Sequence, residues 1–160
     1  MGRPALLGWT VAGLALVVLA FMVGRPAQEQ GVLAGSPSPT TPPPLAITFG
    51  SALDPETNVA SADTTRFRPG DPFAYSVTMA AAPGTDTIWV EIIKHGLDGD
   101  GVAQEASVQH ILPDVATFAF QVRTDDLLAA WGAGDFEMRI YLDPVGRPVA
   151  VGSFTLVDGG

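Results

Sequence analysis

The 160-residue chain carries 17 acidic and 8 basic side chains, which gives a formal net charge of −9 at neutral pH. Phosphate binding needs a basic stripe, and the basic residues here are scattered singly, so this balance argues against a nucleic-acid partner. The chain contains no cysteine, which excludes disulfides, thiol nucleophiles, cysteine zinc ligands and a lipid-modified cysteine anchor.

Residues 1–24 are predicted to hold a membrane-spanning helix. The run 5–24, ALLGWTVAGLALVVLAFMVG, carries no charge, and Thr10 is its only polar side chain. A helix of about 20 residues reaches about 30 Å, the thickness of the hydrocarbon core of a bilayer. We expect an uncleaved single-pass anchor in the cell membrane, with the rest of the chain outside the cytoplasm. The alternative is a signal peptide cut after Val18-Leu19-Ala20, which would give a secreted protein.

Residues 25–44 are expected to form a linker. Prolines stand at positions 26, 37, 39, 42, 43 and 44, among Ser, Thr, Gly and Gln, a composition that builds no packed core. In polyproline II geometry, at about 3.1 Å per residue, the segment is a stalk of up to ~60 Å. A proline-rich ligand for a partner module is the alternative, which the expected extracytoplasmic location disfavours.

From residue 45 onward, short apolar strands alternate with turn signals. Strands are expected at 45–49, 73–79, 87–95, 106–112, 116–122, 136–142 and 148–157, with a short edge strand near Val59 as an option. Pro69-Gly70 suits the centre of a type II turn, and residues 124–131 suit one helical turn capped by Thr124. About seven strands without a βαβ period predict an all-β antiparallel sandwich over residues 45–160.

The last two strands are expected to form a hairpin. Phe136, Met138, Ile140 and Leu142 alternate with Glu137, Arg139 and Tyr141, which is typical of a half-buried strand, and Asp143-Pro144-Val145-Gly146 supplies a turn. In the final strand, Gly152 is predicted to mark a bulge. That bulge would move the inward-facing set from Val149 and Val151 to Phe154 and Leu156.

Four stretches carry a family resemblance: ITFG, FRPGDPF, TIWVEII and AGDFEMRIYLD. Over about residues 45–157 the chain resembles the immunoglobulin-like modules of bacterial membrane-anchored and surface proteins. The resemblance implies that Phe136 takes the place of the corner tyrosine, and Met138 that of a disulfide cysteine. It implies a fold rather than one function, since such sandwiches serve in adhesion, sensing, spacing and assembly.

Two groups of residues suggest metal chemistry, and both have a simpler reading. Asp98 and Asp100 in GLDGDGV are a weak calcium candidate, but a Gly/Asp hairpin loop is the favoured interpretation of them. If this loop centres near residue 100, His95 faces residue 105 and His110 faces residue 90, too far apart along the hairpin to share a zinc ion. We therefore expect no metal site and no cofactor.

Catalytic motifs are not found. The sequence has no GxSxG, no phosphate-cradling glycine loop and no recognisable pair of glycosidase carboxylates. We expect a non-enzymatic protein.

The remaining candidate is a surface, which we call the outer face. If the predicted strands 87–95 and 136–142 turn Ile88, Val90 and Ile92 inward, their other side chains share one exposed face: Trp89, Glu91, Ile93, Glu137, Arg139 and Tyr141. Aromatic residues and arginine are enriched in contact surfaces. Cover by a loop or a register shift is the alternative reading.

These observations favour recognition of, or assembly with, another envelope or extracellular protein. The alternatives are sensing of a small ligand or carbohydrate in a loop-end pocket, and a structural accessory subunit of a membrane complex.

Overall fold

The computed structural model describes residues 41–159. The predicted anchor at 5–24 and most of the linker lie outside the described residues. Within residues 41–159, the structure holds no helix with the length and apolar character needed to span a bilayer.

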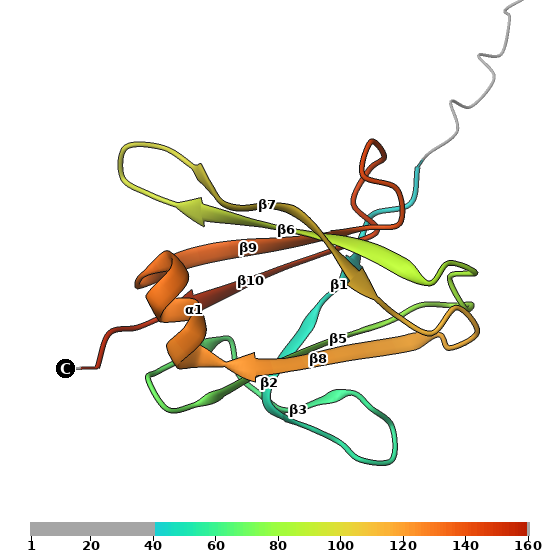
Figure 1. Cartoon of the computed structure of the whole chain (residues 1–160), viewed down its shortest axis with the longest axis horizontal. Helices are drawn as coiled ribbons and strands as arrows, with labels where there is room; N and C mark the ends of the chain where they lie inside the picture. Colours follow the sequence, from blue (N-terminus) through green and yellow to red (C-terminus); the bar gives the residue numbers. More distant parts are fainter. Residues whose placement is uncertain (1–40, 160) are drawn as a thin grey trace, which may run out of the picture. The chain divides into compact units, whose positions relative to one another are not determined.

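Two β-sheets and one helix make up the described chain (Figure 1). The six-stranded sheet has the order β1–β10–β9–β6–β7, with β4 also paired to β10, and the four-stranded sheet has the order β3–β2–β5–β8. In chain order the elements are β1 (Leu45–Ala46), β2 (Thr48–Leu53), β3 (Ala60–Asp63), β4 (Arg66–Phe67), β5 (Pro72–Thr78), β6 (Thr87–His95), β7 (Gly101–His110), β8 (Thr117–Arg123), α1 (Thr124–Trp131), β9 (Gly134–Tyr141) and β10 (Ala150–Leu156). The prediction of an all-β, two-sheet architecture is confirmed, although short strands raise the count above seven.

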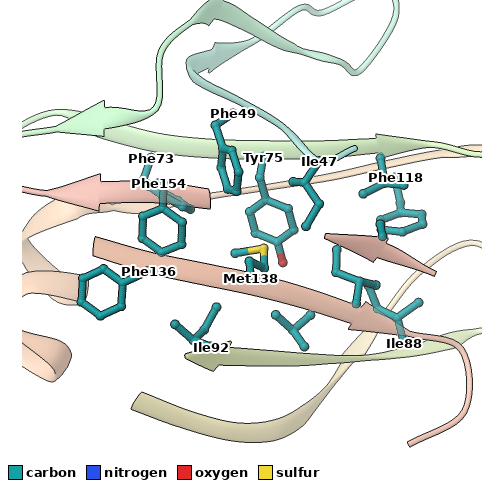
Figure 2. Packing of buried hydrophobic residues seen from close by; sticks show 14 of the residues in the cluster. Ile47, Phe49, Phe73, Tyr75, Ile88, Ile92, Phe118, Phe136, Met138 and Phe154 are labelled. Carbon is teal, nitrogen blue, oxygen red and sulfur yellow. The ribbon is translucent and has the colours of Figure 1, made fainter. Parts of the chain in front are cut away.

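Alternation along the two central strands of the larger sheet determines which side faces the core. On β6, Ile88, Val90 and Ile92 are at most 2% exposed, while the residues between them are half-buried. On β9, Phe136 and Ile140 are fully buried in the same way. The inward faces predicted for these strands are therefore confirmed, and they pack against the smaller sheet (Figure 2).

Aromatic rings fill the space between the sheets. The ring of Phe73 on β5 has its centroid 4.6 Å from that of Phe67 and 4.9 Å from that of Phe154. Phe49 on β2 lies 5.8 Å from Phe73, and Phe136 stacks on Phe154 at 5.3 Å. Such pairs add about 0.5–1.5 kcal/mol each to the free energy gained by burial. These contacts join both sheets in a domain that has no disulfide.

The predicted bulge at Gly152 is wrong. The ladder between β10 and β9 runs without a register shift from Ala150 to Leu156, and the inward-facing set is Ala150, Gly152, Phe154 and Leu156. Val151 instead lies opposite Arg139 on the outer side. A Cβ at position 152 would stand 2.7 Å from Cε2 of Phe49 and 2.8 Å from Cβ of Ile47. Glycine is therefore needed here for the close approach of the chain as it passes from β1 to β2.

Helix α1 begins one residue earlier than predicted, at Thr124 itself, so the prediction of Thr124 as the cap is wrong. Arg123 occupies the N-cap position and makes no side-chain capping bond, whereas Thr124 is the first helical residue and is fully buried. Asp125 accepts a hydrogen bond from the backbone N–H of Gly70 at 3.0 Å. This bond joins the helix to the predicted type II turn, which is confirmed because Gly70 has a φ of 87° and Asp71 N–H donates to the carbonyl of Arg68 at 3.0 Å.

Lys94 on β6 is hydrogen-bonded to the C-terminal end of α1. Its Nζ donates a 2.8 Å hydrogen bond to the carbonyl oxygen of Trp131, where the helix ends, and a cation there complements the helix dipole. The same Nζ lies 5.4 Å from the centroid of the Phe136 ring. Gly134, with a φ of 150°, leaves room for this lysine, because a Cβ there would come 2.8 Å from Cε of Lys94.

Replacement of Gly152 by alanine tests the close approach at β10. The added methyl group would overpack the core against Phe49 and Ile47, so we expect the free energy of unfolding to fall by about 1–3 kcal/mol. Chemical denaturation of the wild type and the variant measures this change. The control is Ser153→Ala, an exposed position on the same strand, for which a change within about 0.5 kcal/mol is expected. A Gly152→Ala protein more stable than the wild type would contradict this account.

Candidate functional site

The structure brings the six predicted residues of the outer face together. Strands β6 and β9 pair antiparallel, so that Trp89 lies opposite Tyr141, Glu91 opposite Arg139 and Ile93 opposite Glu137. This ladder continues to His95 and Asp135 without a register shift. All six side chains are half-buried. They form three cross-strand rows: an aromatic row, a charged row and a mixed row.

Hydrogen bonds hold the charged and aromatic rows in place. The hydroxyl of Tyr141 donates to Oε2 of Glu91 at 2.7 Å. The guanidinium of Arg139 donates from Nε to Oε1 of Glu137 at 2.6 Å, and its Nη1 lies 3.8 Å from Oε2 of Glu91. Charge-assisted bonds of this kind fix long side chains in one geometry. The outer face is therefore organised before any partner arrives.

The same contacts fix the protonation states. The hydrogen bond from Arg139 to Glu137 raises the pKa of the guanidinium further above its ordinary value. Burial, together with the neighbouring carboxylate of Glu91, raises the pKa of the Tyr141 phenol. The arginine therefore stays charged, and the phenol keeps the proton that it donates to Glu91.

Strand β7 adds two apolar side chains that sequence reasoning missed. Val108 pairs with Trp89 and Val102 pairs with Ile93, and each valine is 52% exposed. Register shifts between Val90 and Ile93 break the alternation along β7, so periodicity could not place these valines. They extend the aromatic and mixed rows to the edge of the sheet.

The predicted register of the β6–β7 hairpin is wrong. Gly101 pairs with Lys94, and His110 pairs with Thr87 rather than with residue 90. The loop is therefore shorter than expected and centres closer to β6. His95 does not face residue 105; its Nδ1 lies 2.8 Å from Oδ1 of Asp100.

His95 and His110 lie at opposite ends of the β6–β7 hairpin. Asp100, one of the two calcium candidates, is hydrogen-bonded to His95. Asp98 is exposed in the loop. Over residues 41–159 no cluster of three or more His, Cys, Asp or Glu side chains has a geometry that could hold a metal ion.

The described residues form several hollows, and two of them are lined in part by α1. One, of about 360 Å³, lies beside α1 at the end of the hairpin and is lined by Lys94, His95 and Trp131 among glycines and small apolar residues. The other, of about 130 Å³, lies between the sheets, where Tyr75 donates from its hydroxyl to Oε1 of Gln109 at 2.6 Å. Lys94, His95 and Tyr75 are thus each bonded to protein groups.

The His95–Asp100 pair makes stability depend on pH. The hydrogen bond to Asp100 raises the pKa of His95, so its stabilisation is fully present below the unfolded-state pKa of about 6.5 and is lost as the pH rises through the folded-state pKa. We expect Asp100→Asn to lower the melting temperature at pH 5.5 and to have a smaller effect at pH 8.5. Asp98→Asn, which removes a charge from the same loop, is the control. Equal effects of Asp100→Asn at both pH values would contradict the assignment.

Comparison with known proteins gives no further guide to the function. The chain matches no protein-family model and no curated protein. The case for a function therefore rests on the contacts described above, in which the outer face is the most organised surface feature.

Proposed function

We propose that this chain is a non-catalytic, membrane-anchored immunoglobulin-like module outside the cytoplasm. It recognises another envelope or extracellular protein, or assembles with it, through the outer face of β6 and β9. The observation that carries the proposal is the aromatic row, in which Trp89 and Tyr141 pair across two strands and the exposed Val108 extends them.

The strand order supports an immunoglobulin-like topology. In such sandwiches strands A, B and E share one sheet, strands C, F and G share the other, and variable-type domains add C′ beside C. If β5 is B and β6 is C, then β2–β5–β8 has the order A–B–E, and β10–β9–β6–β7 has the order G–F–C–C′. One departure is the fourth strand of the smaller sheet, because β3 pairs with β2 instead of lying beside β8.

The chemistry of the outer face fits protein recognition. Contact surfaces are rich in tryptophan, tyrosine and arginine, and their central side chains are well ordered before binding. Here Tyr141 and Arg139 are held by Glu91 and Glu137. A partner would meet the aromatic row on one side of the charged row and the mixed row, with Ile93 and Val102, on the other.

Binding of a small ligand in the hollow beside α1 is less well supported. Recognition of a polar ligand or carbohydrate needs hydrogen-bonding groups that converge on it. The lining offers Lys94 and His95, which already bond to Trp131 and Asp100. No Asp or Asn side chain is among the lining residues of this hollow.

Site-specific photocrosslinking tests the proposed face. We expect a benzophenone amino acid at position 108, on the outer face, to give a protein adduct in membranes of cells that make the full chain. The same amino acid at the exposed position Gln121 on β8 is the matched control from the smaller sheet. Trp89→Ala should reduce the adduct about tenfold or more, since central aromatic residues contribute about 2 kcal/mol or more. Equal adducts from positions 108 and 121 would refute the proposal.

A further inference from the structure

We infer that the occupant of the outer face is a second copy of this chain, in a two-fold dimer whose axis runs parallel to β6 and β9. This inference rests on the proposed function, because it uses the same face. It takes the partner to be a second copy of this chain rather than a different envelope protein, and it adds the orientation in which the two domains meet.

The charged row selects the direction of the axis. Glu91 on β6 lies directly opposite Arg139 on the neighbouring strand β9. When two such sheets pack face to face about an axis that runs between β6 and β9 and parallel to them, each Glu91 meets the partner's Arg139. An axis across the strands would instead set Glu91 against the partner's Glu91 and Arg139 against the partner's Arg139. Because an isologous interface must complement itself, the parallel axis suits Glu91 and Arg139, and it places Glu137 over the partner's Ile93.

The aromatic row suits the same axis. Trp89 and Tyr141 are also directly opposite each other on β6 and β9. The two-fold operation therefore places Trp89 over the partner's Tyr141 and brings four large rings together. Aromatic residues paired at the centre of an interface supply much of the binding free energy in protein complexes.

The path of the chain gives an independent reason for a parallel dimer. Leu45 on β1 pairs with Ala150 at the start of β10, whereas the C-terminal segment leaves from Leu156 at the far end of that strand. The described chain thus begins at one end of the sandwich and finishes at the other (Figure 1). An axis parallel to the strands leaves both N-terminal ends on the same side, which suits two chains that carry the membrane anchor proposed above. An axis across the strands would put them on opposite sides.

The net charge of −9 opposes association of two copies. At physiological ionic strength the screening length is about 8 Å, so exposed acidic groups in the loops of the two domains repel each other weakly. Glu91 is half-buried and would be covered by the dimer. Its attraction to the partner's Arg139 is therefore screened less than the repulsion between loops.

Charge exchange between two variants tests the dimer. Full-length chain in detergent micelles at 0.15 M salt is labelled at a single introduced cysteine, Asp158→Cys, which is specific because the chain has no other cysteine. Energy transfer between donor- and acceptor-labelled copies then reports the dimer. We expect Arg139→Glu and Glu91→Arg each to weaken self-association about tenfold or more, because like charges would meet across the axis. An equal mixture of the two variants should recover the transfer, since each supplies the charge that the other needs.

Controls separate this outcome from a loss of folding. Circular dichroism and thermal unfolding establish that each variant is folded, and Arg147→Glu reverses a charge in the exposed β9–β10 loop, where we expect no effect on the dimer. A wild-type monomer at about 100 µM, an association that neither charge variant weakens, or a mixture of folded variants that does not recover would each overturn the dimer. If the dimer is overturned but position 108 crosslinks to a different protein, the proposed function stands and only the dimer fails. If position 108 gives no specific adduct, the proposed function and the dimer both fail.

Discussion

Contact between aromatic rings across the two sheets is the interaction on which the domain depends. Phe73 lies at the centre of this packing, in contact with the rings of Phe49, Phe67 and Phe154. Immunoglobulin-like sandwiches that contain a disulfide obtain part of their stability from that cross-link. Here the chain has no cysteine, and burial of these rings, together with the aliphatic side chains around them, connects the two sheets. A core of this kind is insensitive to the redox state of its surroundings.

The same packing determines what the surface can present. Because successive side chains of a strand point to opposite sides, burial of Ile88, Val90 and Ile92 turns Trp89 and Glu91 outward. The unbroken ladder with β9 then fixes which residues stand side by side. A recognition surface built this way inherits the rigidity of the core beneath it. It therefore loses little conformational entropy when it binds.

Features that depend on local periodicity could be predicted from the sequence. The inward faces of β6 and β9 and the turn at Gly70 are of this kind, as is the composition of the outer face. Gly152 and Lys94 could not be predicted in this way, because each depends on a segment far away in the chain, and β7 could not because its pairing with β6 is irregular. Gly152 packs closely against Ile47, and Lys94 donates a hydrogen bond to the end of α1. The register of β7 is set by irregularities in its pairing with β6. Periodicity reports burial, but it does not report close approach between distant segments.

The short strand β1 has a mechanical consequence when the domain is pulled through its N-terminal segment. Leu45 N–H donates to Val149 at 2.8 Å and Ile47 N–H donates to Val151 at 3.2 Å, and β1 runs parallel to β10. A force applied to the chain before Leu45 and directed along the strands loads both bonds in shear. The two hydrogen bonds must then break together. A force directed across the strands would instead break them one after the other. The first contact of the domain is thus arranged to resist a pull on the segment that precedes it.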